Sequence, residues 1–460
     1  MARPPKDPIP PLSELVDRLD DQAVRALLLV AAEAHDDVAR SLRRVAAGVG
    51  EQIALLRAEV DETLRTRRHL DYSASSGFAY EAEPTVDALE ASALAEPSRE
   101  LVELLERAVG HLVKTIMHAD DSNGSIGDLA HRVLEAHVVA CDAGVADPVR
   151  LAKWMVRFQF DDQDFFAVDP VRYATALGAK GLAAYRTAVQ RHSVEQQAAN
   201  RKQDEWSRES FALRHARERL AVLDRDVERV VELFGGDLTR PNQYLNVAEA
   251  MLEMERVDDA LAWARRGIAE TSGWQVAKLY DLAANVLADR GDSTSVFELR
   301  CEEHRRMASS STYARLQSAA SALDRWADEI GHARAVLAAR DRGGFIDALL
   351  GDGDNDEAWN AALATDASVV GARRWESLAE AREATDPAGA LVVWLRLADE
   401  SLIDADRGAD QAAVRYLKHG QRAARSAGQS ELFAAHVAQL RDQHRRRPTF
   451  ISTLDKAKLG

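Results

Sequence analysis

The chain has 460 residues and a net charge of −16, with 46% hydrophobic and 29% charged residues. Its length exceeds a single core and favours about three domains or one long array. The acidic charge argues against uniform binding to nucleic-acid phosphates. The two cysteines, Cys141 and Cys301, are too few for a disulfide framework or a zinc site of paired cysteines. So few cysteines fit a reducing cytoplasm, where we expect the protein. No apolar run reaches the roughly 18 residues of a membrane span.

The N-terminal part predicts a short lead-in followed by helices. Residues 1–11 are rich in proline and lack the apolar stretch of a signal peptide, so we expect a disordered lead-in. Residues 12–70 predict a helical module in which Asp20 and Asp21 are good caps for the helix that follows them. Residues 71–97 are rich in Ser, Ala, Glu and Gly, and we expect a partly ordered connector there.

The middle of the chain predicts further helices. Residues 98–193 predict a helical domain, because leucine and valine recur at helical spacing from its first residues onward. Asp147 and Pro148 predict the start of another helix, with the proline in its first turn. Residues 194–236 carry opposite charges along an apolar stripe, which predicts one long charged helix that a glycine pair ends.

Residues 237–443 contain the most informative pattern in the chain. The segment Val247–Glu270 predicts a helix, a tight turn and a second helix, with small residues where the two helices approach closely. The pattern returns at Ala283–Glu303, Phe345–Ala364 and Ser377–Leu397. One equivalent position is held in turn by Ala260, Val296, Ala358 and Ala390. These spacings are roughly one or two repeat lengths for helical-pair repeats, whose neighbours must stack to bury their apolar faces.

These patterns predict an all-α protein, a tetratricopeptide-like helical-repeat α-solenoid preceded by N-terminal helical modules. Ala, Leu, Arg and Glu dominate the composition, and they favour helix. A short basic tail, residues 444–460, closes the chain. We expect the large aromatic residues of the array to belong mainly to its core. They are Trp263, Tyr280, Trp326, Trp359, Trp375 and Trp394.

Five segments carry a resemblance to a known family. They are LDDQAVRALLLVAAE, TLRTRRHLDY, HADDSNGSIGDLAHRVLEAH, DDQDFFAVDPVRYATALGAKGLAAYR and LRDQHRRRPTFISTLDKAKL. In this order they resemble the helical region that follows the zinc finger in bacterial SWIM zinc-finger proteins, and related stand-alone domains of unknown function. The finger itself needs a Cys-x-Cys pair and a later Cys-x-His, and this chain has neither. The resemblance therefore implies a helical scaffold, without the zinc or any nucleic-acid role of the finger.

A hairpin around Gly124 gathers histidines and aspartates and is the first candidate site. If the chain folds back about this glycine, His118 faces His131 and His111 faces His137. Imidazole and carboxylate groups are suitable ligands for zinc or another divalent ion. The alternative, which we favour, is that they are ordinary helix residues with the aspartates lining a turn, so we expect no metal and no cofactor. The candidate ligands are His111, His118, Asp121, Asp128, His131 and His137.

An acidic and aromatic loop is the second candidate. Asp161, Asp162 and Asp164 precede Phe165 and Phe166, and together they would form an exposed hook for a basic partner. The structural alternative places both phenylalanines in the core and uses the aspartates as helix caps. We favour this alternative, because large aromatic side chains are more often buried than exposed.

The basic tail is the third candidate. Its side chains Arg445, Arg446 and Arg447 would contact nucleic acid or an acidic partner. The alternative, which we favour, is a solvated terminal helix that neutralises the end of an acidic array.

Catalytic signatures are missing from the sequence, which has no P-loop, no GxSxG, no HExxH and no GxGxxG after a strand. We therefore expect a non-enzyme, a cytoplasmic scaffold that holds a protein partner in a groove lined by the inner helices of the array. One alternative is a nucleic-acid-associated accessory protein, which rests on the SWIM-type resemblance and the basic tail. A second alternative is a metal-dependent enzyme centred on the hairpin at residues 111–137. No membrane partner is expected.

Overall fold

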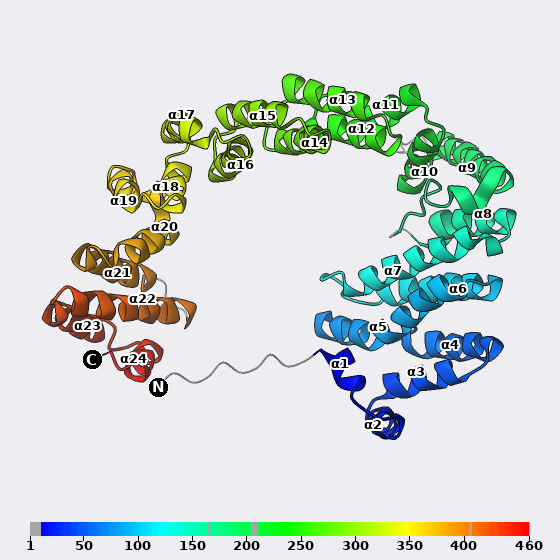
Figure 1. Cartoon of the computed structure of the whole chain (residues 1–460), viewed down its shortest axis with the longest axis horizontal. Helices are drawn as coiled ribbons and strands as arrows, with labels where there is room; N and C mark the ends of the chain where they lie inside the picture. The colour runs from blue at the N-terminus through cyan, green and yellow to red at the C-terminus, as the bar shows by residue number, and fades with distance from the viewer. Residues whose placement is uncertain (1–10, 164–165, 204–209, 404–406, 460) are drawn as a thin grey trace. The chain divides into compact units, whose positions relative to one another are not determined.

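A computed structural model describes residues 11–163, 166–203, 210–403 and 407–459 (Figure 1). Within these ranges the chain forms 24 α-helices and two π-helical turns, with one isolated bridge between Leu70 and Ala119 and no strand. The predicted all-α class is confirmed. The lead-in predicted for residues 1–11 lies outside the described residues, apart from Pro11. None of the helices described combines the length and apolarity that a bilayer crossing requires.

The first of two compact units is Met1–Phe234. In it α2 packs on α3, α5 and α6 both pack on α7, and α8 packs on α9. The helices of this unit are α1 Leu12–Val16, α2 Asp21–Ala34, α3 Asp36–Ala46, α4 Val49–Thr63, α5 Tyr72–Ala95, α6 Arg99–Ile116, α7 Ser125–Ala140, α8 Pro148–Arg157, α9 Ala174–Gln203, α10 Phe211–Leu223 and α11 Val227–Gly235, with π-helical turns at Cys141–Val145 and Phe158–Asp162.

Capping side chains start two of these helices where the sequence predicts them. The carboxylate of Asp20 accepts a hydrogen bond from the backbone N–H of Ala23 at 2.7 Å. The carboxylate of Asp147 accepts one from the backbone N–H of Arg150 at 2.7 Å, and Pro148 occupies the first turn. Each cap satisfies an N–H group that has no partner inside its helix. The predicted starts of α2 and α8 are therefore confirmed.

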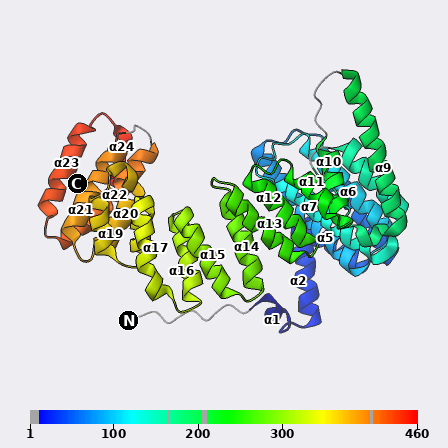
Figure 2. The same ribbon diagram turned by 90° about the horizontal axis from the view of Figure 1, so that it is seen from above.

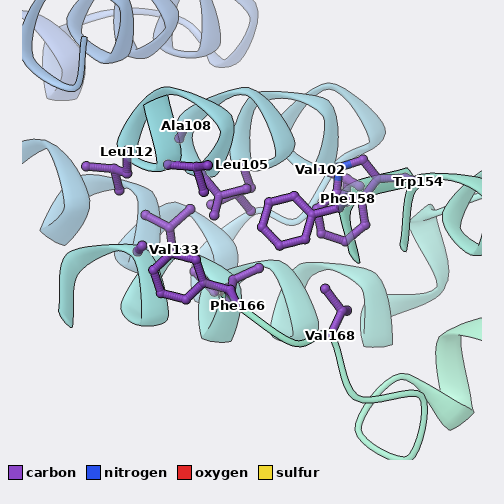
Figure 3. Packing of buried hydrophobic residues seen from close by; sticks show 14 of the residues in the cluster. Val102, Leu105, Ala108, Leu112, Val133, Trp154, Phe158, Phe166 and Val168 are labelled. Atoms are coloured by element: carbon purple, nitrogen blue, oxygen red, sulfur yellow. The ribbon is translucent and has the colours of Figure 1, made fainter. Parts of the chain in front are cut away.

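The core of the first unit includes the contact region of α6, α7 and α8 (Figure 3). Leu105 comes from α6 and Val133 from α7, and both are fully buried. Trp154 of α8 stacks on Phe158 with ring centroids 5.3 Å apart. Phe166, which follows α8 in a loop, lies beside Val133 and is 8% exposed. The loop thus contributes an aromatic side chain to the core.

The connector predicted at residues 71–97 is wrong, because this segment forms the continuous helix α5. A face of small and aliphatic residues runs along it, including Ala82, Val86 and Leu89, each 0% exposed. This face packs against α7, which stabilises the helix. The alanines and glutamates of the segment favour helix as well, so the predicted connector gave too much weight to its serines and glycine. The Asp71 carboxylate caps its start.

The single long helix predicted at residues 194–236 is also wrong. The structure places α10 and α11 there as separate helices, with α9 ending at Gln203. Between α10 and α11 the chain turns at Arg225, whose φ of 54° is left-handed. The N–H of Asp226 donates to the carbonyl of Ala221 at 3.1 Å, which closes the end of α10. The opposite charges along residues 194–236 do not predict this turn.

The second unit, Gly235–Gly460, is a series of helical hairpins. Neighbouring helices α14, α15, α16 and α17 lie side by side along it (Figure 2). The predicted tetratricopeptide-like solenoid of helix pairs is confirmed. Its helices are α12 Pro241–Glu253, α13 Val257–Glu270, α14 Val276–Asp289, α15 Ser293–Arg306, α16 Ser310–Ser321, α17 Trp326–Arg340, α18 Arg342–Gly351, α19 Asn355–Leu363, α20 Ala367–Arg382, α21 Pro387–Ser401, α22 Arg407–Ser426, α23 Ser430–Gln443 and α24 Pro448–Lys456.

The predicted repeat register is confirmed at its equivalent position. Ala260, Val296, Ala358 and Ala390 are each the fourth residue of the second helix in a hairpin. The three alanines are 0% exposed, and the valine is partly buried. About two turns further along α13, a Cβ added to Gly267 would lie 2.6 Å from the Cβ of Tyr244, so the hairpin closes only with glycine there.

The aromatic residues of the array belong largely to its core, as predicted. Tyr280 and Trp394 are 0% exposed, Trp375 is 6% exposed and Trp359 is 8% exposed. Trp263 and Trp326 are partly buried and pack against the same cores.

The separate basic tail predicted at residues 444–460 is wrong as a boundary. Residues 448–456 form α24, which packs on α22. Phe450 and Leu454 are 0% exposed and Leu459 is 1% exposed, and all three belong to the core cluster of the last hairpins. The array therefore continues through the tail, because an amphipathic last helix covers the apolar face that its final pair would expose.

Candidate functional site

A groove of about 750 Å³ lies on the α12 and α14 face of the array. Its floor is apolar, and its rim is polar and mostly charged. The floor residues are Leu245, Leu252, Leu282 and Val286. The rim residues are Glu249, Lys278, Asp281, Asn285, Asp289 and Arg290.

Helical spacing explains why these residues line the groove. On α12, Tyr244, Val247 and Met251 are buried in the hairpin contact. The floor residues Leu245 and Leu252 are seven positions apart, so they share one face, about 100° round the helix from Tyr244. The first helix of each hairpin thus offers one face to the core and another to the groove.

The rim of the groove is acidic. Glu249 and Asp289 are exposed, and neither forms an ion pair with any residue that the structure describes. Lys278 is exposed and likewise has no ion pair in the described part of the chain. Arg290 contributes no free charge, because it pairs with Asp258 at 2.7 Å. Unpaired carboxylates therefore outnumber unpaired cations around the apolar floor.

A buried ion network holds the third rim carboxylate in place. The guanidinium of Arg300 donates to Asp281 at 2.9 Å and to Glu303 at 2.7 Å. Glu303 is 0% exposed and also accepts from Arg315 at 2.6 Å. The network joins α14, α15 and α16, so the groove wall is a rigid part of the array and not a loop.

A larger hollow of about 1010 Å³ lies in the first unit, but its lining differs. Acidic and basic side chains such as Asp36, Glu62, Arg40, Arg65 and Arg68 dominate it. Leu70, Phe78 and Tyr80 also line it, but charged side chains outnumber them, so it is less suited to an aliphatic side chain of a partner.

The histidines of the hairpin around Gly124, the first candidate site, have separate partners. His111 contacts Asp61 of α4 through Nε2 at 2.9 Å, and burial lowers the pKa of this histidine. The hydrogen bond from Arg107 holds the pKa of Asp61 at about 2. His137 contacts the hydroxyl of Tyr173 through Nδ1 at 2.8 Å, and burial lowers its pKa as well. The expected facing of His111 and His137 is therefore wrong, because each side chain packs against another helix or loop.

The other candidate ligands of this hairpin serve the turn or face solvent. Asp121 accepts hydrogen bonds from the backbone N–H groups of Ile126 and Gly127, both at 2.9 Å. His118 and Asp128 are exposed, and the ring of His131 lies edge-on to Phe166. Among the residues that the structure describes, no three histidine, cysteine or acidic side chains are arranged to hold a metal ion.

The two cysteines are not placed as nucleophiles. Cys141 is buried next to His137, at 3.7 Å from its Nε2 atom. Burial raises the pKa of the Cys141 thiol to about 12, so the neighbouring imidazole does not generate a thiolate. Burial also raises the pKa of Cys301 to about 11.

The acidic loop is described only in part. Asp164 and Phe165 lie outside the described residues, and so do the side chains of Asp161 and Asp162, whose backbone belongs to the second π-helical turn. Phe166 is buried, as the structural alternative predicts for it.

The arginines of the tail do not act as one cluster. Arg447 pairs with Asp410, a carboxylate that is 1% exposed, at 2.7 Å. Arg445 pairs with Asp442 at 3.4 Å, while Arg446 is exposed. Sequence alone gave no basis for separating these three neighbours, because the partner of Arg447 lies 37 positions earlier in the chain.

Comparisons with known proteins add little to this site. No family model matches the chain, and no curated protein matches it. Among solved structures it is similar to a protein described as "Circular tandem repeat protein with novel repeat topology and enhanced subunit contact surfaces". The two share 14% identity over 95% of this chain and 96% of that one, with a TM-score of 0.20. The helical hairpins described above, and not this likeness, define the fold.

Proposed function

We propose that this chain is a non-catalytic scaffold that binds a protein partner in the cytoplasm. The α12–α14 groove would hold an extended segment of the partner, with one large aliphatic side chain on the floor and a basic side chain at the rim. The observation that carries the proposal is the apolar floor within an acidic rim. Solenoids of helical pairs present such surfaces to peptides, and a few buried anchor residues supply most of the binding energy of an interface.

Two pools of labelled octapeptides test this function. One pool contains a single leucine and a single arginine among Gly, Ser and Ala, and the other replaces the arginine with glutamate. We expect the leucine–arginine pool to bind the full chain more tightly in fluorescence anisotropy. Leu282→Glu should weaken that binding about tenfold or more, because a carboxylate would face the aliphatic anchor.

Charge reversal at the rim tests the second half of the proposal. Glu249→Lys and Asp289→Lys should each weaken binding of the leucine–arginine pool by about two- to fivefold, because an exposed ion pair contributes about that much to affinity. Leu432→Glu is the control for Leu282→Glu, because it makes the same change at an exposed leucine of α23 outside the groove. Equal loss in this control, or no preference between the pools, would contradict the proposed function.

A further inference from the structure

Helix α2 is apolar around most of its circumference, yet it contains no buried residue. Leu27 is 57% exposed, Leu28 42%, Leu29 57% and Val30 64%. Four consecutive helical residues point in directions about 100° apart, so aliphatic side chains emerge on nearly every side. Helices of this kind are normally buried against other elements.

This exposure is concentrated in one place. Of the 22 large hydrophobic residues that the structure describes as exposed, six lie between Val16 and Val30. The others are scattered singly along the chain or in small groups, which is usual for a protein surface. A contiguous exposed apolar patch, by contrast, marks an interaction surface.

The position of α2 explains why its own chain leaves it uncovered. It packs on α3, which in turn packs on α4, so it is the outer helix of the first hairpin. A hollow of about 710 Å³ remains between α2 and α3, lined in part by Leu28, Leu29 and Leu42. Stacked helical arrays need polar helices at their ends, and α2 does not provide one.

The pattern of α2 fits another helix. Ala23, Leu27, Val30 and Ala34 follow one another at spacings of four, three and four residues, which is the spacing of a helix–helix seam. This seam contains no charge, and its small alanines allow a close approach.

The charges at the two ends of α2 indicate which kind of partner would bind there. The carboxylates Asp20, Asp21, Glu33, Asp36 and Asp37 are all exposed around these ends. They outnumber the exposed cations nearby, which are Arg25 on the helix, Arg18 before it, paired with Glu14, and Arg43 in the last turn of α3. A second copy of the chain would bring acidic ends against acidic ends in either orientation. An anionic membrane surface would be repelled in the same way.

We propose that α2 is the docking surface for an amphipathic helix of a partner protein, apolar along one face and basic at both ends. The partner helix covers the Leu27–Val30 seam, and its lysines or arginines meet the terminal carboxylates. This surface is distinct from the array groove, so the two proposals stand or fall separately.

Two synthetic helical peptides with blocked ends are the probes, KKLLALLALLKK and EELLALLALLEE. In fluorescence anisotropy with the full chain, the basic peptide should bind at least tenfold more tightly than the acidic one. The double variant Leu27→Glu, Val30→Glu should weaken binding of the basic peptide at least tenfold. Because this variant makes the chain more acidic, non-specific attraction of the basic peptide would instead grow.

Leu432→Glu again serves as the control, since it adds the same charge at an exposed leucine outside α2 and should leave the affinity unchanged. Circular dichroism should show the same helix content in all variants, because both α2 positions are exposed and glutamate favours helix. Equal binding of the two peptides, or undiminished binding in the double variant, would overturn the proposal. A dimer in sedimentation velocity that the double variant dissociates would overturn it in favour of a second copy.

Discussion

Ala260 shows how closely two helices of a hairpin approach in this protein. It is 0% exposed on α13, whereas Ala262 on the same helix faces solvent. Ala260→Trp should therefore lower the free energy of unfolding by about 1–3 kcal/mol, the usual cost of overpacking. Ala262→Trp should change it by less than about 0.5 kcal/mol. Urea unfolding followed by circular dichroism measures both, and equal costs would show that the contact is not tight.

The buried histidines of the first unit predict a pH dependence of stability. Burial lowers the pKa of His111 and of His137 below the ordinary value of 6.5. The unfolded chain then binds protons more readily than the folded chain, so stability is complete above about pH 6.5 and is lost as the pH falls below it. The free energy of unfolding should consequently be lower at pH 5.0 than at pH 7.5.

The variant His137→Gln tests whether His137 causes this pH dependence. It should reduce the difference between the free energies of unfolding at pH 5.0 and pH 7.5, even if it lowers stability at both through loss of the Tyr173 contact. His118→Gln should keep the wild-type difference, because His118 is exposed. A difference that stays unchanged in His137→Gln would show that other groups cause the pH dependence.

The histidine hairpin also shows where residue spacing stops being informative. The spacing places His111 and His137 on helical faces, and both do lie on α6 and α7. Their partners, however, are Asp61 and Tyr173, which lie 50 and 36 positions away. These contacts depend on long-range packing, so the residue spacing within the hairpin does not predict them.

At the scale of elements, the docking of α24 depends on one buried ion pair. Asp410 of α22 is 1% exposed and is held by Arg447 at 2.7 Å and by the hydroxyl of Thr449 at 2.7 Å. Arg447→Ala would leave a buried carboxylate without its cation, and should lower the free energy of unfolding by about 3 kcal/mol or more. The neighbouring Arg446 is exposed, so Arg446→Ala should cost less than about 0.5 kcal/mol.

Thermal unfolding of these two variants distinguishes a structural tail from a recognition tail. A large loss of thermal stability in Arg447→Ala, without a similar loss in Arg446→Ala, supports the structural role of α24. Equal stability of the two variants would mean that the pair with Asp410 contributes little, and the tail arginines would return as a partner-binding candidate.

At the scale of the whole molecule, the net charge of −16 is reflected in two acidic surfaces. The array groove and helix α2 each combine an apolar centre with exposed carboxylates. Both proposals therefore expect basic partners, and both interactions should weaken as salt rises, because exposed charges are screened within about 10 Å at 0.1 M salt. The relation to SWIM zinc-finger proteins stays a prediction.

The sequence by itself determined the all-α class and the register of the helical pairs, since Ala260, Ala358 and Ala390 occupy the same buried position. That information is local, because helical periodicity and small residues at close contacts repeat along the chain. Tertiary structure alone decided that the chain turns at Arg225 and that Arg447 is a core partner. In each case the stabilising contact comes from a distant element or from backbone geometry, which no local pattern records.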